Sequence, residues 1–132
     1  AGASAMPASE DTVRNRLHYI KMNGNAIFKI AVNKMRETFQ NSMKKAGIGP
    51  EDLTLVIPHQ ANLRIIESLR NFLGLPSEKV YVNIHKYGNT SAASIPIAFA
   101  EAVENGLIKR GDIVGFAAFG GGLTWGSAII QY

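Results

Sequence analysis

The run LTLVI, residues 53–57, constrains the fold of this chain more than any other stretch. It is short, rich in β-branched residues and almost wholly apolar, which is typical of a strand covered on both faces. After a short polar link, NLRIIESLRNFLG (62–74) repeats apolar residues at helical spacing and ends at Gly74. A buried strand followed directly by a helix predicts an α/β unit with a right-handed crossover.

The same alternation recurs along the chain. Residues 26–46 carry one apolar stripe at 3.6-residue spacing and predict an amphipathic helix, which GIGPED (47–52) ends. KVYVNI (79–84) predicts the next strand, and residues 89–106 predict a helix. Pro96 lies inside that helix, so we expect a kink or a broken first turn.

The C-terminal end predicts two further strands, DIVGFAAFG (112–120) and TWGSAIIQY (124–132), joined by a tight glycine turn and therefore antiparallel. HYIKM (18–22) could be a short extended piece. The element order predicts an α/β fold with a mixed, mostly parallel sheet and covering helices. A chain of 132 residues suffices for one domain, which we expect over residues 26–132, with residues 1–25 as a surface segment leading into it.

Composition excludes several classes of protein. Because the chain has no cysteine, it can supply neither disulfides, nor cysteine-ligated zinc, nor a cysteine nucleophile. The histidines at 18, 59 and 85 lack the spacing of a helical metal site, so we expect no metal.

The formal net charge of +4 indicates a mildly basic surface or a patch for an anionic partner. The basic residues are scattered without interleaved aromatic residues, which argues against nucleic acid. No uncharged apolar run approaches ~18 residues, and the first residues lack the pattern of a signal peptide. We therefore expect no membrane association and a cytoplasmic location.

Two polar side chains follow the predicted strands 53–57 and 79–84. His59 comes after one proline, and Asn89 comes after HKYG. Open α/β sheets bind ligands beyond the carboxyl ends of their parallel strands, and adjacent strands lie ~5 Å apart. If the two strands are neighbours, His59 and Asn89 can direct two N–H donors at one ligand atom. Such a pair suits a developing oxyanion, for example a thioester enolate.

Structural roles stay open for the same residues. Asn89 and Asn62 could each cap the helix that follows, and His59 could be a half-buried histidine with satisfied hydrogen bonds. His18 and His85 are expected in loops or on the surface. FGGGLTWG (119–126) lacks the lysine and hydroxyl residue of a phosphate loop, so a tight turn is the simpler interpretation.

Several motifs in order resemble one known family. They are MNGNAIFKIAV (22–32), PHQANLRI (58–65), YGNTSAASIP (87–96) and FGGGLTWGSA (119–128). Together they resemble β-ketoacyl-acyl-carrier-protein synthase III, the FabH-type enzyme, over essentially the whole chain. The resemblance implies a thiolase-like fold of which this chain is the C-terminal half. It also implies a homodimer, no cofactor or metal, and a nucleophilic cysteine supplied by the N-terminal half.

The resemblance implies an acyltransferase of type II fatty acid synthesis. Such an enzyme joins acetyl-CoA to malonyl-acyl-carrier-protein in a decarboxylative Claisen condensation. His59 and Asn89 would be the catalytic residues of this half and would stabilise the enolate. Phe119 would wall the site, and the backbone N–H of Gly121 would help to hold the oxyanion. The alternatives are another Cys-His-Asn acyl-thioester condensing enzyme of secondary metabolism, or a non-catalytic thiolase-fold binding or dimerisation module.

The resemblance also assigns residues to the substrate arm and to the carrier protein. Gly24, Phe28 and Asn62 would line the tunnel for pantetheine, although Phe28 could instead pack within the helix stripe. The carrier-protein contacts that it implies are Lys29, Gln60, Ala61, Asn62, Leu63 and Arg64. The guanidinium of Arg64 suits an acidic carrier helix or a phosphate, since it donates as a fork.

Overall fold

The computed structural model describes residues 2–132 and contains a three-stranded sheet in the order β1-β2-β3. β1 (Leu55–Pro58) pairs in parallel with β2 (Ile113–Gly120), and β2 pairs antiparallel with β3 (Thr124–Gln131). The predicted α/β class with a mixed sheet and covering helices is therefore confirmed. The antiparallel pairing of the last two strands is confirmed as well.

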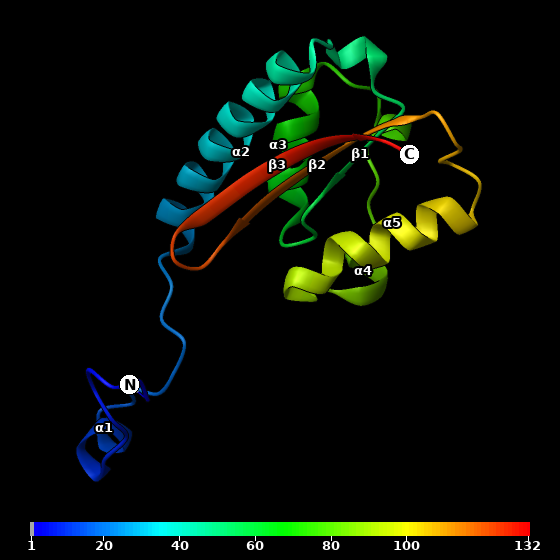
Figure 1. The fold of residues 1–132 in the computed structure, drawn as a ribbon. Coiled ribbons are helices and arrows are strands. Elements are labelled where there is room, and N and C mark those ends of the chain that lie inside the picture. Colours follow the sequence, from blue (N-terminus) through cyan, green and yellow to red (C-terminus); the bar gives the residue numbers. More distant parts are fainter. Residues whose placement is uncertain (1) are drawn as a thin grey trace.

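Helices cover both faces of this sheet (Figure 1). α2 (Gly24–Ala46) and α3 (Leu63–Leu73) pack on one face, and α5 (Ser94–Glu104) packs on the other. The remaining helical segments are short: α1 (Glu10–Arg14), η1 (Pro50–Asp52), η2 (Ser77–Lys79), α4 (Ile84–Tyr87) and η3 (Ser91–Ala93).

β1 shows why its sequence is apolar throughout. Val56 packs into the core formed with α2 and α3, whereas Leu55 and Ile57 pack into the core formed with α5. All four residues of the strand are buried. A strand buried on both faces loses the alternation of polar and apolar residues, as the sequence predicted for this segment.

The two long helices agree with the sequence pattern. α2 begins at Gly24, two residues before the predicted start, because the Asn23 side chain caps it by accepting the N–H of Ala26 at 3.1 Å. It ends at Gly47, whose φ of 69° is left-handed. α3 ends in the same way at Gly74, with φ of 65°, so this predicted C-cap is confirmed.

The strand predicted over residues 79–84 is wrong. Val80 makes one parallel bridge with Val56, and Tyr81 donates its N–H to the Val56 carbonyl at 2.9 Å. From Ile84 onward the backbone turns into α4. The segment therefore does lie beside β1, as expected, but it pairs with β1 only at its first residues.

The side chain of Gln60 explains why the ladder stops. Its Oε1 accepts the N–H groups of Asn83 at 3.0 Å and Ile84 at 3.2 Å. Its Nε2 donates to the carbonyls of Pro58 at 2.8 Å and Tyr81 at 3.1 Å. One buried amide thus satisfies backbone groups that a continued strand would pair with its neighbour.

The helix predicted over residues 89–106 forms in two pieces. The 3₁₀ turn η3 comes first, and α5 starts only at Ser94. Pro96 is the third residue of α5, where its missing N–H has no partner within the helix. The predicted broken first turn is confirmed.

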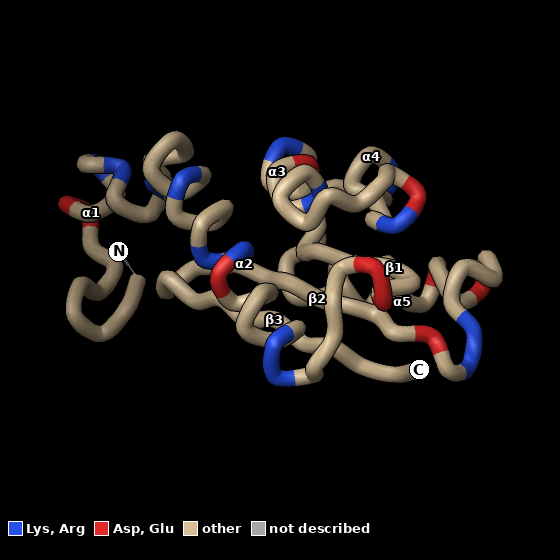
Figure 2. The backbone as a smooth tube through the Cα atoms, turned by 90° about the horizontal axis from the view of Figure 1, so that it is seen from above, with Lys and Arg blue, Asp and Glu red and all other residues tan. Residues whose placement is uncertain are grey.

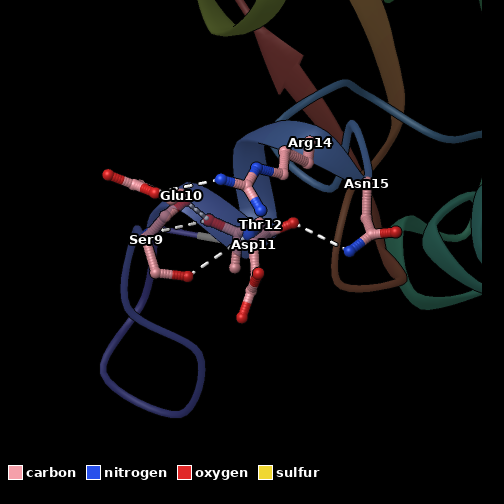
Figure 3. Close-up of polar contacts among 6 residues, drawn as sticks. All are labelled: Ser9, Glu10, Asp11, Thr12, Arg14 and Asn15. Carbon is pink, nitrogen blue, oxygen red and sulfur yellow. Dashed lines mark hydrogen bonds and ion pairs between the residues drawn. The ribbon is translucent and has the colours of Figure 1, made fainter.

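The N-terminal segment stands away from the sheet (Figure 1) and contains α1, which the sequence analysis did not predict. A capping box explains this helix: Ser9 Oγ accepts the N–H of Thr12 at 3.2 Å, and Thr12 Oγ1 accepts the N–H of Ser9 at 2.8 Å (Figure 3). Arg14 and Glu10 form an exposed ion pair at 3.2 Å. No strand forms over residues 18–22, where the chain makes a turn and then continues irregularly.

Charged residues are distributed over several elements instead of forming one stripe (Figure 2). Lysine and arginine residues are interspersed with acidic residues along the backbone. In the part of the chain that the structure describes, no helix is both long and apolar enough to cross a membrane. No group of three or more His, Asp or Glu side chains within residues 2–132 could hold a metal ion.

Candidate active site

A cleft of about 870 Å³ opens beyond the carboxyl end of β1. Its walls come from residues within four segments: 22–28 at the start of α2, 59–65 after β1, 89–95 before and within α5, and 118–126 around the β2–β3 turn. This is the position at which open α/β sheets bind ligands. The cleft therefore brings together segments that lie far apart in the sequence.

His59 lines this cleft and is held by two hydrogen bonds. Its backbone N–H donates to the Ala117 carbonyl at 2.7 Å, which continues the contact between β1 and β2. Its Nδ1 lies 2.6 Å from Ser94 Oγ, whereas Nε2 has no hydrogen bond to any of residues 2–132. Burial lowers the pKa of the imidazole below its ordinary value, which favours the neutral ring.

Asn89 lines the same cleft from the loop before η3. Its Oδ1 accepts the N–H of Ser91, the first residue of η3, at 2.9 Å, but the N-cap positions of η3 and α5 are Thr90 and Ala93, so Asn89 is not the predicted helix cap. Its Nδ2 makes no hydrogen bond within the described part of the chain. The contact with Ser91 is compatible with a role in the cleft, because it occupies the acceptor of the amide and leaves its donor available.

The segment 91–94 orients both side chains. The Ser91 N–H holds Asn89, and the Ser94 hydroxyl contacts His59. Ser91 has a φ of 53°, which is uncommon for a residue other than glycine. The segment 91–94 thus fixes one polar atom of each side chain and leaves the other without a hydrogen bond in the described chain.

Gln60 has a different position from the one predicted. It is 1% exposed, and all four hydrogen-bonding positions of its amide are used within the chain. Such a side chain has no surface to offer a protein partner, so the structure argues against a direct carrier-protein contact by Gln60. Its role is to join the end of β1 to residues 81–84.

The other predicted residues lie in or beside the cleft. Its walls include Gly24, Phe28, Ala61, Asn62, Phe119 and Gly121. Asn62 also caps α3, since its Oδ1 accepts the N–H of Arg64 at 2.9 Å. The Arg64 guanidinium lies 5.1 Å from the centre of the Phe28 ring. Leu63, which is 49% exposed, Arg64 and Lys29 all face solvent.

Ser94 is a site residue that was not predicted from the sequence. The available signal was a hydroxyl residue near the opening of the predicted helix 89–106. Which strand end that helix faces depends on tertiary packing, so the pattern alone could not pair Ser94 with His59.

The parallel strand pair, the terminal hairpin and the cleft at the strand ends define the C-terminal part of a thiolase-like α/β fold. Residues 43–132 match the family model described as 3-oxoacyl-[acyl-carrier-protein (ACP)] synthase III C terminal. The chain belongs to this family.

Named relatives agree with the family model. The chain is 52% identical over all of its 132 residues to the β-ketoacyl-[acyl-carrier-protein] synthase III of Natranaerobius thermophilus, of which it covers 40%. A crystal structure of the corresponding synthase from Aquifex aeolicus matches 89% of this chain and 38% of its own, with 54% identity and a TM-score of 0.86. The chain thus spans about 40% of the length of the curated relatives it matches.

One similar structure has another biosynthetic context. The priming β-ketosynthase from the R1128 polyketide biosynthetic pathway is 32% identical, with a TM-score of 0.81 over 94% of this chain and 39% of its own. The fold of this chain is therefore shared by synthases of two pathways.

Proposed function

We propose that this chain is the C-terminal part of a condensing enzyme of type II fatty acid synthesis. The enzyme joins acetyl-CoA to malonyl-acyl-carrier-protein with loss of CO₂. The nucleophilic cysteine belongs to an N-terminal half that this sequence does not include, and the proposal includes a cytoplasmic homodimer without a cofactor. The names of the relatives support the reaction class.

One observation carries the proposal for the chemistry. His59 and Asn89 line one cleft, and each has its other polar atom bonded to the segment 91–94. Two N–H donors that line one cleft can stabilise negative charge that develops on a thioester oxygen during decarboxylation. Because the donors are oriented before substrate binds, little reorganisation is needed when the enolate forms. Phe119 and the Gly121 N–H complete the wall and the oxyanion contacts in this proposal.

The carrier protein approaches the rim of the cleft in this proposal. Arg64 and Lys29 supply positive charge there, and Leu63 supplies an exposed apolar contact. Phe28, beneath the Arg64 guanidinium, lines the path of the pantetheine arm, together with Gly24 and Asn62. Ala61 and Asn62, which line the cleft next to this rim, are further carrier-protein contacts in this proposal.

A chimera tests the proposal because the chain lacks a cysteine. These 132 residues replace the matching 40% of the Natranaerobius relative, and malonyl-acyl-carrier-protein decarboxylation is measured. His59→Ala and Asn89→Ala should each lower its rate roughly 10²- to 10³-fold, since each removes one donor. Acetyl transfer from acetyl-CoA should fall less. His85→Ala, on an exposed position of α4 outside the cleft, is the matched control.

Two outcomes would count against the proposal. Equal loss of decarboxylation and acetyl transfer would remove the enolate role from His59 and Asn89. A chimera that condenses other acyl thioesters but not acetyl-CoA would favour the second candidate, a priming synthase like the R1128 structure. In the same chimera, Arg64→Glu should raise the KM for the carrier protein, and salt should reduce the difference.

A further inference from the structure

The Ser94 hydroxyl is buried between two polar groups of the segment after β1. Ser94 is 2% exposed at the first position of α5. Its Oγ lies 2.6 Å from His59 Nδ1 and 3.2 Å from the backbone nitrogen of Gln60. No other hydrogen bond reaches this hydroxyl from residues 2–132, so these two contacts decide how its proton is used.

The Gln60 backbone settles half of this arrangement. A backbone N–H can only donate, so Ser94 Oγ accepts the hydrogen bond from Gln60. The serine proton must then find an acceptor, and His59 Nδ1 is the one within reach. If Nδ1 carried the imidazole proton instead, Oγ would accept two hydrogen bonds and its own proton would be buried without a partner. Buried donors without partners are rare in folded proteins.

We propose that Ser94 is a positioning residue that donates its hydroxyl proton to His59 Nδ1 and thereby holds the neutral imidazole as the Nε2–H tautomer. The neutral ring then presents the N–H of Nε2 as a donor, and this nitrogen has no hydrogen bond in the described chain. The catalytic consequence of this inference rests on the proposed function, but the tautomer itself does not. The lowered pKa of His59 supports it, since only the neutral ring has a tautomer to fix.

The Asn89 contact uses the same principle with the opposite atom. There the Ser91 N–H binds the carbonyl oxygen of the amide, which determines that the NH₂ group is left over. At His59 a hydroxyl binds one ring nitrogen, which determines that the N–H is left over. The contacts of residues 91–94 therefore leave an N–H donor of each side chain without a bond in the described chain.

Ring-nitrogen NMR of the ¹⁵N-labelled chain, at a pH at which His59 is neutral, tests this inference directly. His59→Gln assigns the signals, and the exposed His18 and His85 provide internal references. We expect an unprotonated Nδ1 and a protonated Nε2 in His59. A proton on Nδ1 would overturn the inference without any need for a variant.

Variants then test whether Ser94 is the cause. In Ser94→Ala the populations of the two His59 tautomers should change and both ring-nitrogen shifts should move, whereas Ser94→Thr, which keeps the hydroxyl, should restore them. Ser42→Ala is the matched control, because Ser42 also loses a partly buried hydroxyl contact, to Ser127 Oγ at 2.7 Å. An unchanged His59 tautomer in Ser94→Ala would overturn the inference.

Activity separates this inference from the proposed function. In the chimera, Ser94→Ala should lower malonyl decarboxylation about 5-fold, the rate equivalent of one ordinary hydrogen bond, with KM unchanged. An inactive chimera with the expected tautomer would remove the proposed function and leave the role of Ser94 intact. An active, His59-dependent chimera with the proton on Nδ1 would do the reverse.

Discussion

On the helix-covered faces of the sheet, alternate side chains of β1 pack into two apolar cores, whereas beyond Pro58 the same chain makes its contacts mainly through hydrogen bonds. Val56 and Ile57 are both fully buried, one in each core. Directly after Pro58, His59 and Gln60 are held by hydrogen bonds. Both residues bond to Ser94, His59 also bonds to β2, and Gln60 also bonds to residues 81–84.

This difference has a physical consequence. Packing against helices depends on the summed volume and shape of many contacts, so it tolerates small changes that conserve volume. A hydrogen-bonded segment depends on particular atoms, because each buried donor or acceptor that loses its partner costs its full desolvation. Changes beyond Pro58 that conserve volume but remove a hydrogen-bonding atom should therefore cost more than volume-conserving changes on the helix-covered faces.

Replacing Gln60 with leucine should have the largest effect on stability. The change keeps a similar volume but leaves four backbone groups without their partner, among them the N–H groups of Asn83 and Ile84. We expect a loss of about 3–5 kcal/mol in the free energy of unfolding. Urea unfolding measures the loss, and amide hydrogen exchange should show that Asn83 and Ile84 lose protection.

Gln60→Glu is the matched variant for this prediction. The glutamate side chain can still accept the N–H groups of Asn83 and Ile84, but as a carboxylate it cannot donate to the carbonyls of Pro58 and Tyr81. Protonation of the carboxyl relieves the burial of its charge. The loss of unfolding free energy should therefore be smaller in Gln60→Glu than in Gln60→Leu. If Gln60→Leu costs less than about 1 kcal/mol, hydrogen bonds do not dominate this segment, and the contrast with the packed faces disappears.

An added methyl group at Gly115 tests the packed side of the comparison. A Cβ on this β2 residue would lie 2.5 Å from Cζ of the Phe39 ring and 3.3 Å from Cδ1 of Ile129. Gly115→Ala should therefore cost about 1–3 kcal/mol by overpacking, as measured by urea unfolding. Gly126→Ala on β3 is the control, since no atom lies within 4 Å of its added Cβ.

A second substitution checks the cause. Phe39→Leu alone should destabilise the core, but Gly115→Ala should cost less in that background than in the parent chain, because the ring is gone. Strictly additive losses would show that the strain does not come from the contact between Gly115 and Phe39.

The packed regions were predicted well from the sequence because their apolar residues recur at regular spacing. Apolar spacing is a direct record of which face of an element is buried, so α2, α3 and the hairpin of β2 and β3 followed from it. The glycines at 47 and 74 marked the helix ends because their left-handed φ values suit glycine. The segment 79–84 was predicted as a strand from its apolar pattern as well, and that prediction was wrong.

That failure and the missed Ser94 have one cause. The β-branched pattern of 79–84 was real, but the Gln60 side chain, more than twenty residues away, binds the backbone at Asn83 and Ile84. Likewise, Ser94 meets His59 only because α5 packs against β1. Side-chain hydrogen bonds between distant segments leave no periodic pattern in the sequence. The contacts at the polar end of the fold could therefore not be predicted from the sequence alone.

Low pH should weaken the hydrogen-bonded region and not the packed one, and this effect should be smaller than those of Gln60→Leu and Gly115→Ala. Glu101 accepts from Asn83 Nδ2 at 2.8 Å and pairs with Lys86, and these contacts lower the pKa of its carboxyl from 4.5 to about 2. A folded-state pKa below the unfolded value stabilises the protein above about pH 4.5, and this contribution is lost as the pH falls toward 2. The ion pair is partly exposed, so the contribution is modest.

Glu101→Gln should therefore flatten the decline of unfolding free energy below about pH 4.5, as measured by urea unfolding from pH 7 to pH 3. Glu104→Gln, at an exposed position on the same helix, is the matched control variant. His59 acts in a higher window, because its burial-lowered pKa makes stability fall as the pH drops below 6.5. Gly115→Ala should shift the whole curve without changing its shape, since its strain involves no titrating group. A Gly115→Ala curve that changes slope, or a Glu101→Gln curve that does not, would remove the physical distinction between the two regions.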